Sequence, residues 1–416
     1  MKLEVLPADK GDCLMIHTDV GGKPGLVLID GGPAGVFADT LLPRLEELRQ
    51  ERIDEELIGE DEPLVIDLLI VSHVDDDHLN GIIDLLQEMK DEADASKPPR
   101  FRILEIWHNS FDRVLGNDET GALLGEAPQF GAASTNALQS LVEEAEQGPP
   151  TDHAKILASV KQGDDLKQLA QALGIPVNAQ FGGKLIQTSP DRTVTGTAAG
   201  IEFVVAGPRQ SELIELQKEF DRWLKKQPFA DRSPAAMLAA LDDESAANLS
   251  SIVLLARKDG KTLLLTGDAR SDKVLDGLDD AGLCGPNESV EVGVLKMPHH
   301  GSIRNLDEQG DFLRRVTSRH YVFSGNGEHS NPDRETFELL FNARPGAEMN
   351  LYLTYTLAEI DPTRKAVYDK ERAKKLKKGH EVPIWSDAAH SLKAILEPAP
   401  DGVHVIAATG STIIEP

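Results

Sequence analysis

Residues 69–83 read LIVSHVDDDHLNGII and place two histidines and three aspartates, His73 to His78, within six positions. The mostly apolar residues 64–71 before the first histidine have the length and branching of a buried strand. The apolar side chains after the second histidine recur at helical spacing. Five ionisable groups at the end of a strand are costly to bury unless something compensates their charge. The stretch therefore predicts a strand, a ligand-bearing loop and a helix around a divalent cation.

The composition is that of an ordinary globular protein, with 416 residues, 40% hydrophobic and 27% charged. No run of about 18 apolar residues occurs, which argues against a membrane span. The N-terminus becomes polar too early for a secretory signal. Cys13 and Cys284 are the only cysteines, which excludes a disulfide framework and a cysteine-based zinc site. We expect a cytoplasmic protein without a membrane partner; the sequence points to no protein partner.

The formal charge of −27 argues against a nucleic-acid binder with an overall basic surface. We interpret the excess of carboxylates as a solvated acidic surface that favours solubility. One basic stretch, residues 364–378, stands apart from it. This stretch could hold a polyanionic substrate, but we favour the interpretation that it is a solvated helix face balancing the acidic surface.

Ligand-type residues also follow three later strand-like segments. Residues 263–268, LLLTGD, end in Asp268; residues 294–302, VLKMPHHGS, carry His299 and His300; residues 321–332, YVFSGNGEHSNP, carry His329. Each alone would more often be structural. Together they predict ligands gathered on loops at one rim of a sheet, as in a site that holds two metal ions.

Spacing also favours convergence within the first stretch. Residues two apart in an extended chain face the same way, so His73, Asp75 and Asp77 can converge, and His78 can turn into the same space. Mixed histidine and carboxylate ligands suit zinc, manganese or iron. The alternative, an aspartate-rich loop that only caps a helix, needs one carboxylate and no histidine.

These motifs resemble the metallo-β-lactamase-like hydrolase superfamily, whose signature is His-x-His-x-Asp-His. His73, Asp75, Asp77 and His78 stand in its four liganding places, with Asp75 where most members have histidine. The same aspartate, together with the segments GDCLMIH, LVLIDGG and the three later ones, forms a motif set. This set is similar to that of the hydrolase domain of the ComEC-type competence DNA-uptake channel and its free-standing soluble relatives. The motifs span residues 3 to about 340.

The resemblance implies a mixed α/β (α+β) fold, an αββα sandwich of two sheets flanked by helices with two metal ions at one edge. We expect residues 1–416 to form a single hydrolase domain. Within it, residues 90–243 are predicted to be a mostly helical insertion. Residues 345–416 are predicted to complete the sandwich.

The resemblance also implies roles for individual residues. His73 and Asp75 would bind the first metal, Asp77 and His78 the second, and Asp268 would bridge them. His329 matches the last histidine of the superfamily. Asn248 stands near the place of the usual third-motif histidine, which we infer is replaced by His299 or His300. Asp30 would orient the ligands, and Asp12 is expected to be structural; Asn248, Ser302 and Asn326 are candidates to donate a hydrogen bond to the substrate.

We expect a hydrolase with two divalent metal ions, Zn²⁺ or Mn²⁺, that uses a metal-bridging hydroxide, with Asp77 and Asp268 as catalytic residues. The leading hypothesis is a phosphodiesterase or nuclease. One alternative is a hydrolase of a small ester, lactone or phosphodiester with the same site, which the acidic surface favours. Another is a binding or regulatory partner that keeps the fold without turnover.

Overall fold

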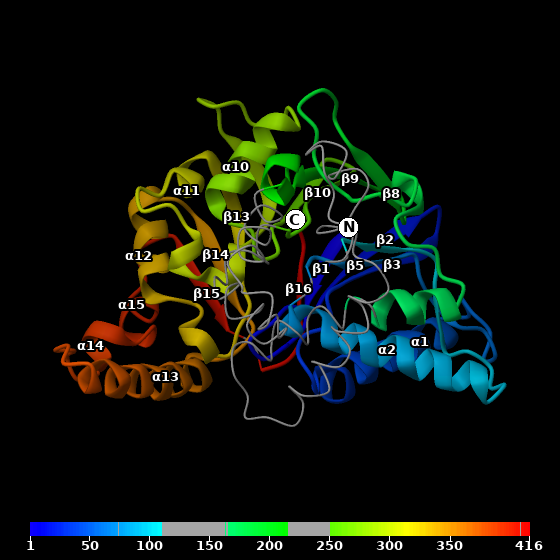
Figure 1. Ribbon diagram of the computed structural model, residues 1–416, viewed down its shortest axis with the longest axis horizontal. Coiled ribbons are helices and arrows are strands. Elements are labelled where there is room, and N and C mark those ends of the chain that lie inside the picture. Colours follow the sequence, from blue (N-terminus) through cyan, green and yellow to red (C-terminus); the bar gives the residue numbers. More distant parts are fainter. Residues whose placement is uncertain (74, 110–162, 164, 215–249, 408) are drawn as a thin grey trace, which may run out of the picture.

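The computed structural model describes residues 1–73, 75–109, 163, 165–214, 250–407 and 409–416, and the structural statements below concern these residues. Two large sheets and a small one organise them (Figure 1). The six-stranded sheet has the order β16-β1-β2-β3-β5-β7 among the described residues. Its strands are β1 (Lys2–Val5), β2 (Leu14–Val20), β3 (Lys23–Ile29), β5 (Leu68–Val71), β7 (Ile106–His108) and β16 (Thr412–Ile414).

The second large sheet has eight strands among the described residues, in the order β15-β14-β13-β12-β11-β10-β9-β8. They are β8 (Thr195–Ala198), β9 (Ile201–Gly207), β10 (Val253–Lys258), β11 (Lys261–Leu265), β12 (Val290–Lys296), β13 (Val316–Phe323), β14 (Met349–Leu353) and β15 (Val403–Ala407). Neighbours from β8 to β11 are antiparallel, and neighbours from β11 to β15 are parallel. Strands β3, β5 and β7 of the first sheet are parallel to one another. Parallel neighbours end at the same edge of their sheet.

The two large sheets pack face to face. Along β3, Val27 and Ile29 point into a core shared with Leu254 and Leu265 of the second sheet. The alternate β3 residues instead face a second core, together with residues of the helices on the outer side. A third core lies under the helices on the outer face of the eight-stranded sheet. The predicted mixed α/β fold is confirmed, with helices on both outer faces of the paired sheets.

Helices α1 (Leu42–Asp54) and α2 (Asp76–Asp94) cover the six-stranded sheet, and α10 (Ser271–Asp280), α11 (Asp311–Arg315) and α12 (Arg334–Ala343) cover the other (Figure 1). A π-helical turn, η1 (Phe37–Leu41), leads into α1. The other described elements are η2 (Ala179–Phe181), η3 (Pro298–Gly301), η4 (Ile303–Asn305), η5 (Glu328–Ser330), α13 (Leu357–Lys377), α14 (Asp387–His390) and α15 (Lys393–Leu396). No described helix has both the length and the apolarity needed to cross a membrane.

The predicted strand over residues 64–71 is two strands. β4 (Leu64–Ile66) pairs with β6 (Phe101–Ile103) in the small sheet, whereas β5 pairs with β3 in the six-stranded sheet. Asp67 separates them, because its backbone N–H donates to the Leu26 carbonyl over 2.8 Å and its carboxylate accepts from the Leu26 N–H over 2.8 Å. These bonds tie the break to β3.

The range 90–243, predicted to be an insertion, contributes described strands to both large sheets. β7 pairs with β5, and β9 pairs with β10. These segments therefore belong to the sheets, and residues 110–162 and 215–249 lie outside the described part of the chain. Residues 345–416 contribute β14 and β15 to one sheet and β16 to the other.

Candidate metal centre

The candidate metal centre surrounds Asp268, which follows β11 at the edge where the parallel strands end. Its side chain is nearly inaccessible to solvent, with 3% exposed. Its Oδ1 atom lies 3.4 Å from Nε2 of His78 and 3.5 Å from Nε2 of His300. One oxygen of this carboxylate therefore faces two histidines. His78 follows a strand of the six-stranded sheet, and His300 follows a strand of the eight-stranded sheet.

The other oxygen of Asp268 faces a second group. Oδ2 lies 3.7 Å from Nε2 of His73 and 3.6 Å from Nε2 of His299. Nε2 of His73 also lies 3.4 Å from Oδ2 of Asp75. Asp75 and His299 are the more open members, with 33% and 21% of their side chains exposed. Asp268 thus stands between two ligand sets, one of which reaches solvent.

The donor atoms of this centre fit divalent cations. Nε2 of His73, His78 and His300 and Oδ1 of Asp268 are buried and make no hydrogen bond to any described residue. A buried polar atom without a partner costs about 1–3 kcal/mol. Two ligand atoms bound at about 2.0–2.2 Å in tetrahedral geometry would lie about 3.4 Å apart, which matches the observed separations. One cation on the Oδ1 side of Asp268 would satisfy three of these atoms, and a second cation on the Oδ2 side would satisfy Nε2 of His73.

Electrostatics also favour positive charge in this space. Burial lowers the pKa of His300, but Asp268 and Asp12 outweigh it and raise that pKa to about 9. The pKa of His78 is likewise raised, against the effect of burial, by Asp268 and Asp30. Burial raises the pKa of Asp268, yet the neighbouring histidines hold it well below its usual range. Asp268 therefore stays ionised and attracts a cation.

Asp30 holds His78 in one orientation. Its Oδ2 lies 2.8 Å from Nδ1 of His78 and accepts a 2.7 Å hydrogen bond from the Ser72 hydroxyl. Its Oδ1 accepts from the Ser72 backbone N–H over 2.7 Å. This contact keeps the imidazole proton on Nδ1 and leaves the Nε2 lone pair directed at the centre. The predicted orienting role agrees with this geometry.

Gly31 lets the Asp30 turn lie directly against α2. A Cβ atom at Gly31 would be 2.6 Å from the backbone nitrogen of Ile82, closer than any side chain can approach. The Gly31 N–H donates to the His78 carbonyl over 2.8 Å. The close approach holds the first turn of α2 and its His78 beside Asp30.

Asp12 supports His300 in a similar way, although the sequence assigned it only a structural role. Nδ1 of His300 lies 2.9 Å from the Ser324 hydroxyl, which donates in turn to Oδ1 of Asp12. Oδ2 of Asp12 lies 2.7 Å from Nζ of Lys296, and both side chains are almost completely buried. Asp12 is one of four residues close enough to share an ion, with His78, Asp268 and His300. Because both its oxygens are engaged, we interpret it as a support for His300.

The two adjacent histidines reach the centre through unusual backbone angles. His299 and His300 in η3 have φ values of 47° and 57°, in the left-handed region that non-glycine residues seldom adopt. Their rings are 5.7 Å apart and nearly perpendicular, at 83°. Such strain is found where surrounding contacts fix it, often at functional sites. It brings both side chains to Asp268, at 3.6 Å for His299 and 3.5 Å for His300. The sequence offered these two histidines as alternatives, and both lie at the centre.

Asp77 lies in the first turn of α2, where His78 lowers its pKa despite the opposing effect of burial. Its carbonyl is covered by Gly11, at which a Cβ atom would lie only 1.8 Å away. The loop after β1 therefore packs directly on the ligand-bearing turn.

The other predicted residues in the described part of the chain follow η3 or β13. His329 is exposed in η5 and is not among the four residues grouped above. Asn326 contacts Asp9, with 3.5 Å between its Nδ2 and a carboxylate oxygen. Ser302 is buried, and its backbone N–H donates to the His299 carbonyl over 2.9 Å. Asn248 lies outside the described residues.

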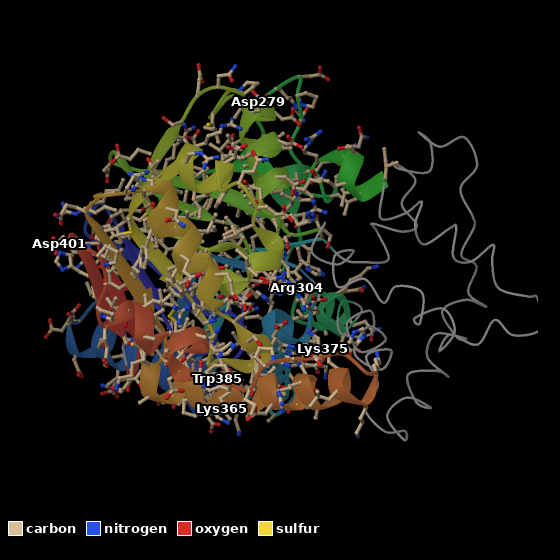
Figure 2. All side chains as sticks on the ribbon, turned by 90° about the vertical axis from the view of Figure 1, so that its left-hand side faces the viewer. Asp279, Arg304, Lys365, Lys375, Trp385 and Asp401 are labelled. Carbon is tan, nitrogen blue, oxygen red and sulfur yellow. The ribbon has the colours of Figure 1, made fainter. Side chains whose placement is uncertain are left out.

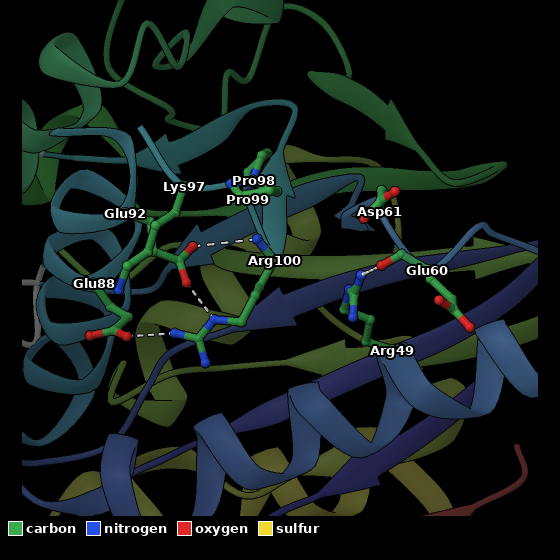
Figure 3. Close-up of a pocket in the computed structure, with 9 residues that line it drawn as sticks. All are labelled: Arg49, Glu60, Asp61, Glu88, Glu92, Lys97, Pro98, Pro99 and Arg100. Atoms are coloured by element: carbon green, nitrogen blue, oxygen red, sulfur yellow. Dashed lines mark hydrogen bonds and ion pairs between the residues drawn. The ribbon is translucent and has the colours of Figure 1, made fainter. Parts of the chain in front are cut away.

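A separate groove is lined by Arg49, Glu60, Asp61, Glu88, Glu92, Lys97, Pro98, Pro99 and Arg100 (Figure 3). Arg100 is bound by Glu88 and Glu92, and Arg49 donates to the Glu60 carbonyl. The two arginines are thus engaged with the groove's own acceptors.

No protein-family model matches the chain, and no curated protein matches it. The chemistry of the centre is therefore inferred from its own residues.

Replacing Asp30 by asparagine should weaken metal binding by about 10–100-fold, the usual effect of losing a residue that orients a ligand. Both Asp30 oxygens accept hydrogen bonds, so either orientation of the amide would set a donor against a donor at Ser72 or His78. Calorimetric titration of metal-free protein with Mn²⁺ or Zn²⁺ measures the change. The exposed Asp39→Asn variant is the control, and equal affinity in the two variants would contradict the role of Asp30.

Proposed function

We propose that the protein is a divalent-metal-dependent hydrolase of the metallo-β-lactamase-like type, acting on phosphodiesters. The observation that carries the proposal is the arrangement around Asp268: its Oδ1 faces two buried histidines, and its Oδ2 faces one buried and one partly exposed histidine. Two metal ions with a shared carboxylate suit in-line displacement at phosphorus. The paired sheets with helices on both outer faces agree with the sandwich expected for this type.

His78, His300 and Asp77 would hold one cation with Oδ1 of Asp268, and His73, His299 and Asp75 would hold the other with Oδ2. When bound, divalent cations would supply Lewis acidity and lower the pKa of a coordinated water to about 7. The chain itself positions the ligands, through Asp30 behind His78 and Asp12 behind His300. Substrate would enter on the side of Asp75 and His299, whose side chains are partly exposed.

The carboxylates in the ligand set bear on the choice of metal. Asp75 stands where a second histidine would give a softer, less negative site. Carboxylate ligands suit hard cations, so we propose Mn²⁺ as the preferred metal, with Zn²⁺ as the alternative.

A second candidate is a hydrolase of a small ester, lactone or phosphodiester with the same centre. The net charge of −27 favours it, since a long polyanion is repelled by most of the surface. Polymer and small-ester substrates therefore have to be compared directly.

Purified metal-free protein should hydrolyse bis-p-nitrophenyl phosphate, linear DNA or RNA only after Mn²⁺ or Zn²⁺ is added. The Asp77→Ala and His78→Ala variants should lose about a hundred-fold or more of this activity, because each removes a proposed ligand worth several kcal/mol of transition-state stabilisation. Absence of metal-dependent turnover on every substrate would overturn the phosphodiesterase proposal. Cleavage of the small ester alone would select the second candidate, and full activity in both variants would overturn the site.

A further inference from the structure

Helix α13 carries a concentration of positive charge in an acidic chain. Residues 370–378 contain six lysines and arginines and one glutamate, whereas the whole chain has a formal charge of −27. Figure 2 shows Lys365 and Lys375 along this helix, with Trp385 beside it. The sequence alone favours a solvated helix face. The contacts of α13 in the fold show which side of the helix packs against the chain and which side carries the exposed lysines.

The first half of α13 rests on the loop that leads back to the candidate metal centre. The Arg364 guanidinium donates to the Ser330 carbonyl in η5 over 3.0 Å. A Cβ atom at Gly327 would lie 2.5 Å from the Ile360 carbonyl oxygen and 3.1 Å from Cβ of Thr363. The same loop begins at Ser324, which binds His300. One loop thus joins α13 to the centre.

The helix face that touches this loop continues as a row of lysines. Counted from Thr363, Lys370, Lys374, Lys377 and Lys378 follow at intervals of 7, 11, 14 and 15 residues. These intervals return to one side of an α-helix. We call Lys370, Lys374, Lys377 and Lys378 the lysine stripe; all four are exposed.

Few acids neutralise the stripe. Lys374 pairs with Glu371, with 2.7 Å between Nζ and Oε1. Among the described residues, no carboxylate lies at ion-pair distance from Lys370, Lys377 or Lys378. The stripe is therefore available to an anion from outside.

A different side of α13 is covered by the chain itself. Residues 382–390 fold back along it: Tyr368 donates to the Pro383 carbonyl, Arg372 to the Val382 carbonyl and Arg364 to the His390 carbonyl, over 3.0, 3.0 and 2.8 Å. This packing holds the helix in place and turns the stripe outward.

We propose that the lysine stripe binds the backbone of a nucleic-acid strand whose neighbouring phosphodiester reaches the candidate metal centre; this rests on the proposed function and names its substrate class. The stripe begins about 10 Å along the helix from Thr363 and is about 12 Å long, at 1.5 Å per residue. One strand of a duplex carries one phosphate per about 3.4 Å of helix axis, so this length spans three to four of them. Charge complementarity identifies the occupant, because the site and the stripe recognise the same repeating phosphodiester.

An anionic membrane fits the stripe less well. A helix that lies in a membrane interface needs an apolar face beside its basic one. The buried residues of α13 are Ile360 and Arg364, both in its first half. Leu376, its exposed large apolar side chain, is placed away from the stripe by helical spacing.

The test uses the full chain and a fluorescein-labelled single-stranded DNA oligonucleotide, with anisotropy measured in EDTA so that binding is independent of cleavage. The variant K370Q/K374Q/K377Q/K378Q should raise Kd at least roughly tenfold at low salt and reduce the salt slope of log Kd by about 3, because about 0.7 is lost per released phosphate contact. The matched control K23Q/K97Q/K184Q/K393Q removes the same charge from exposed lysines elsewhere and should bind as wild type.

Both variants should keep wild-type kcat/KM on bis-p-nitrophenyl phosphate, while KM for the oligonucleotide rises only in the stripe variant. Unchanged oligonucleotide binding in the stripe variant, or an equal loss in the control, would overturn the docking surface. Stripe-dependent binding to phosphatidylserine vesicles but not to the oligonucleotide would replace nucleic acid by membrane and overturn it too. Stripe-dependent oligonucleotide binding without hydrolysis of either substrate would support the surface and overturn the proposed function.

Discussion

Replacing Asp268 by asparagine should lower metal-dependent kcat/KM on bis-p-nitrophenyl phosphate by about a thousand-fold, equivalent to about 4 kcal/mol of transition-state stabilisation. The amide removes the central charge and sets an N–H group toward one of the two ligand sets that Asp268 now serves. One ligand set would keep an oxygen of residue 268, and the other would face the amide N–H donor in its place. Metal content, measured by mass spectrometry after dialysis, should fall together with activity.

The control for this variant is Asp272→Asn, four residues further along the chain in α10. Asp272 is half exposed and paired with Arg270, so its loss should change neither metal content nor kcat/KM. Circular dichroism of both variants checks that the fold is kept. An Asp268→Asn protein that retains both metal ions and wild-type turnover would remove Asp268 from the centre.

Much of the fold could be predicted from the sequence because apolar residues line both faces of the strands in a regular alternation. The alternation along β3, with Val27 inward and Leu28 outward, follows directly from a strand with a core on each side. The break at Asp67 was missed, since it depends on a partner in β3 that is 41 positions earlier in the chain. Strands β7 and β9 were assigned to an insertion because polar segments between them conceal their long-range pairing.

The candidate centre was predictable where its residues follow strands. His73, Asp268 and His300 come directly after apolar runs, and parallel strands gather such residues at one edge. Asp12 and Lys296 were not assigned to it, because no spacing rule joins a turn aspartate to a strand lysine 284 positions later. Their link is made by burial and sheet packing.

Replacing Lys296 by methionine should lower the free energy of unfolding of the metal-free protein by about 3–5 kcal/mol, the usual cost of removing one partner from a buried ion pair. Lys296 and Asp12 are both about 1% exposed, and Nζ lies 2.7 Å from the carboxylate. Without the ammonium, the charge of Asp12 would remain buried with only the Ser324 and His300 contacts. Urea unfolding followed by circular dichroism measures the loss.

The double variant K296M/D12N separates charge from packing. The neutral amide at position 12 needs no counter-ion and can still accept a hydrogen bond from Ser324. Most of the lost stability should therefore return in the double variant. A double variant no more stable than Lys296→Met alone would contradict a charge effect. Added Mn²⁺ gives a further test, because a cation held by His300 lies close enough to Asp12 to replace part of the lost positive charge. Mn²⁺ should therefore stabilise Lys296→Met more than it stabilises wild type, whereas equal stabilisation would show that Asp12 and the metal centre are not coupled.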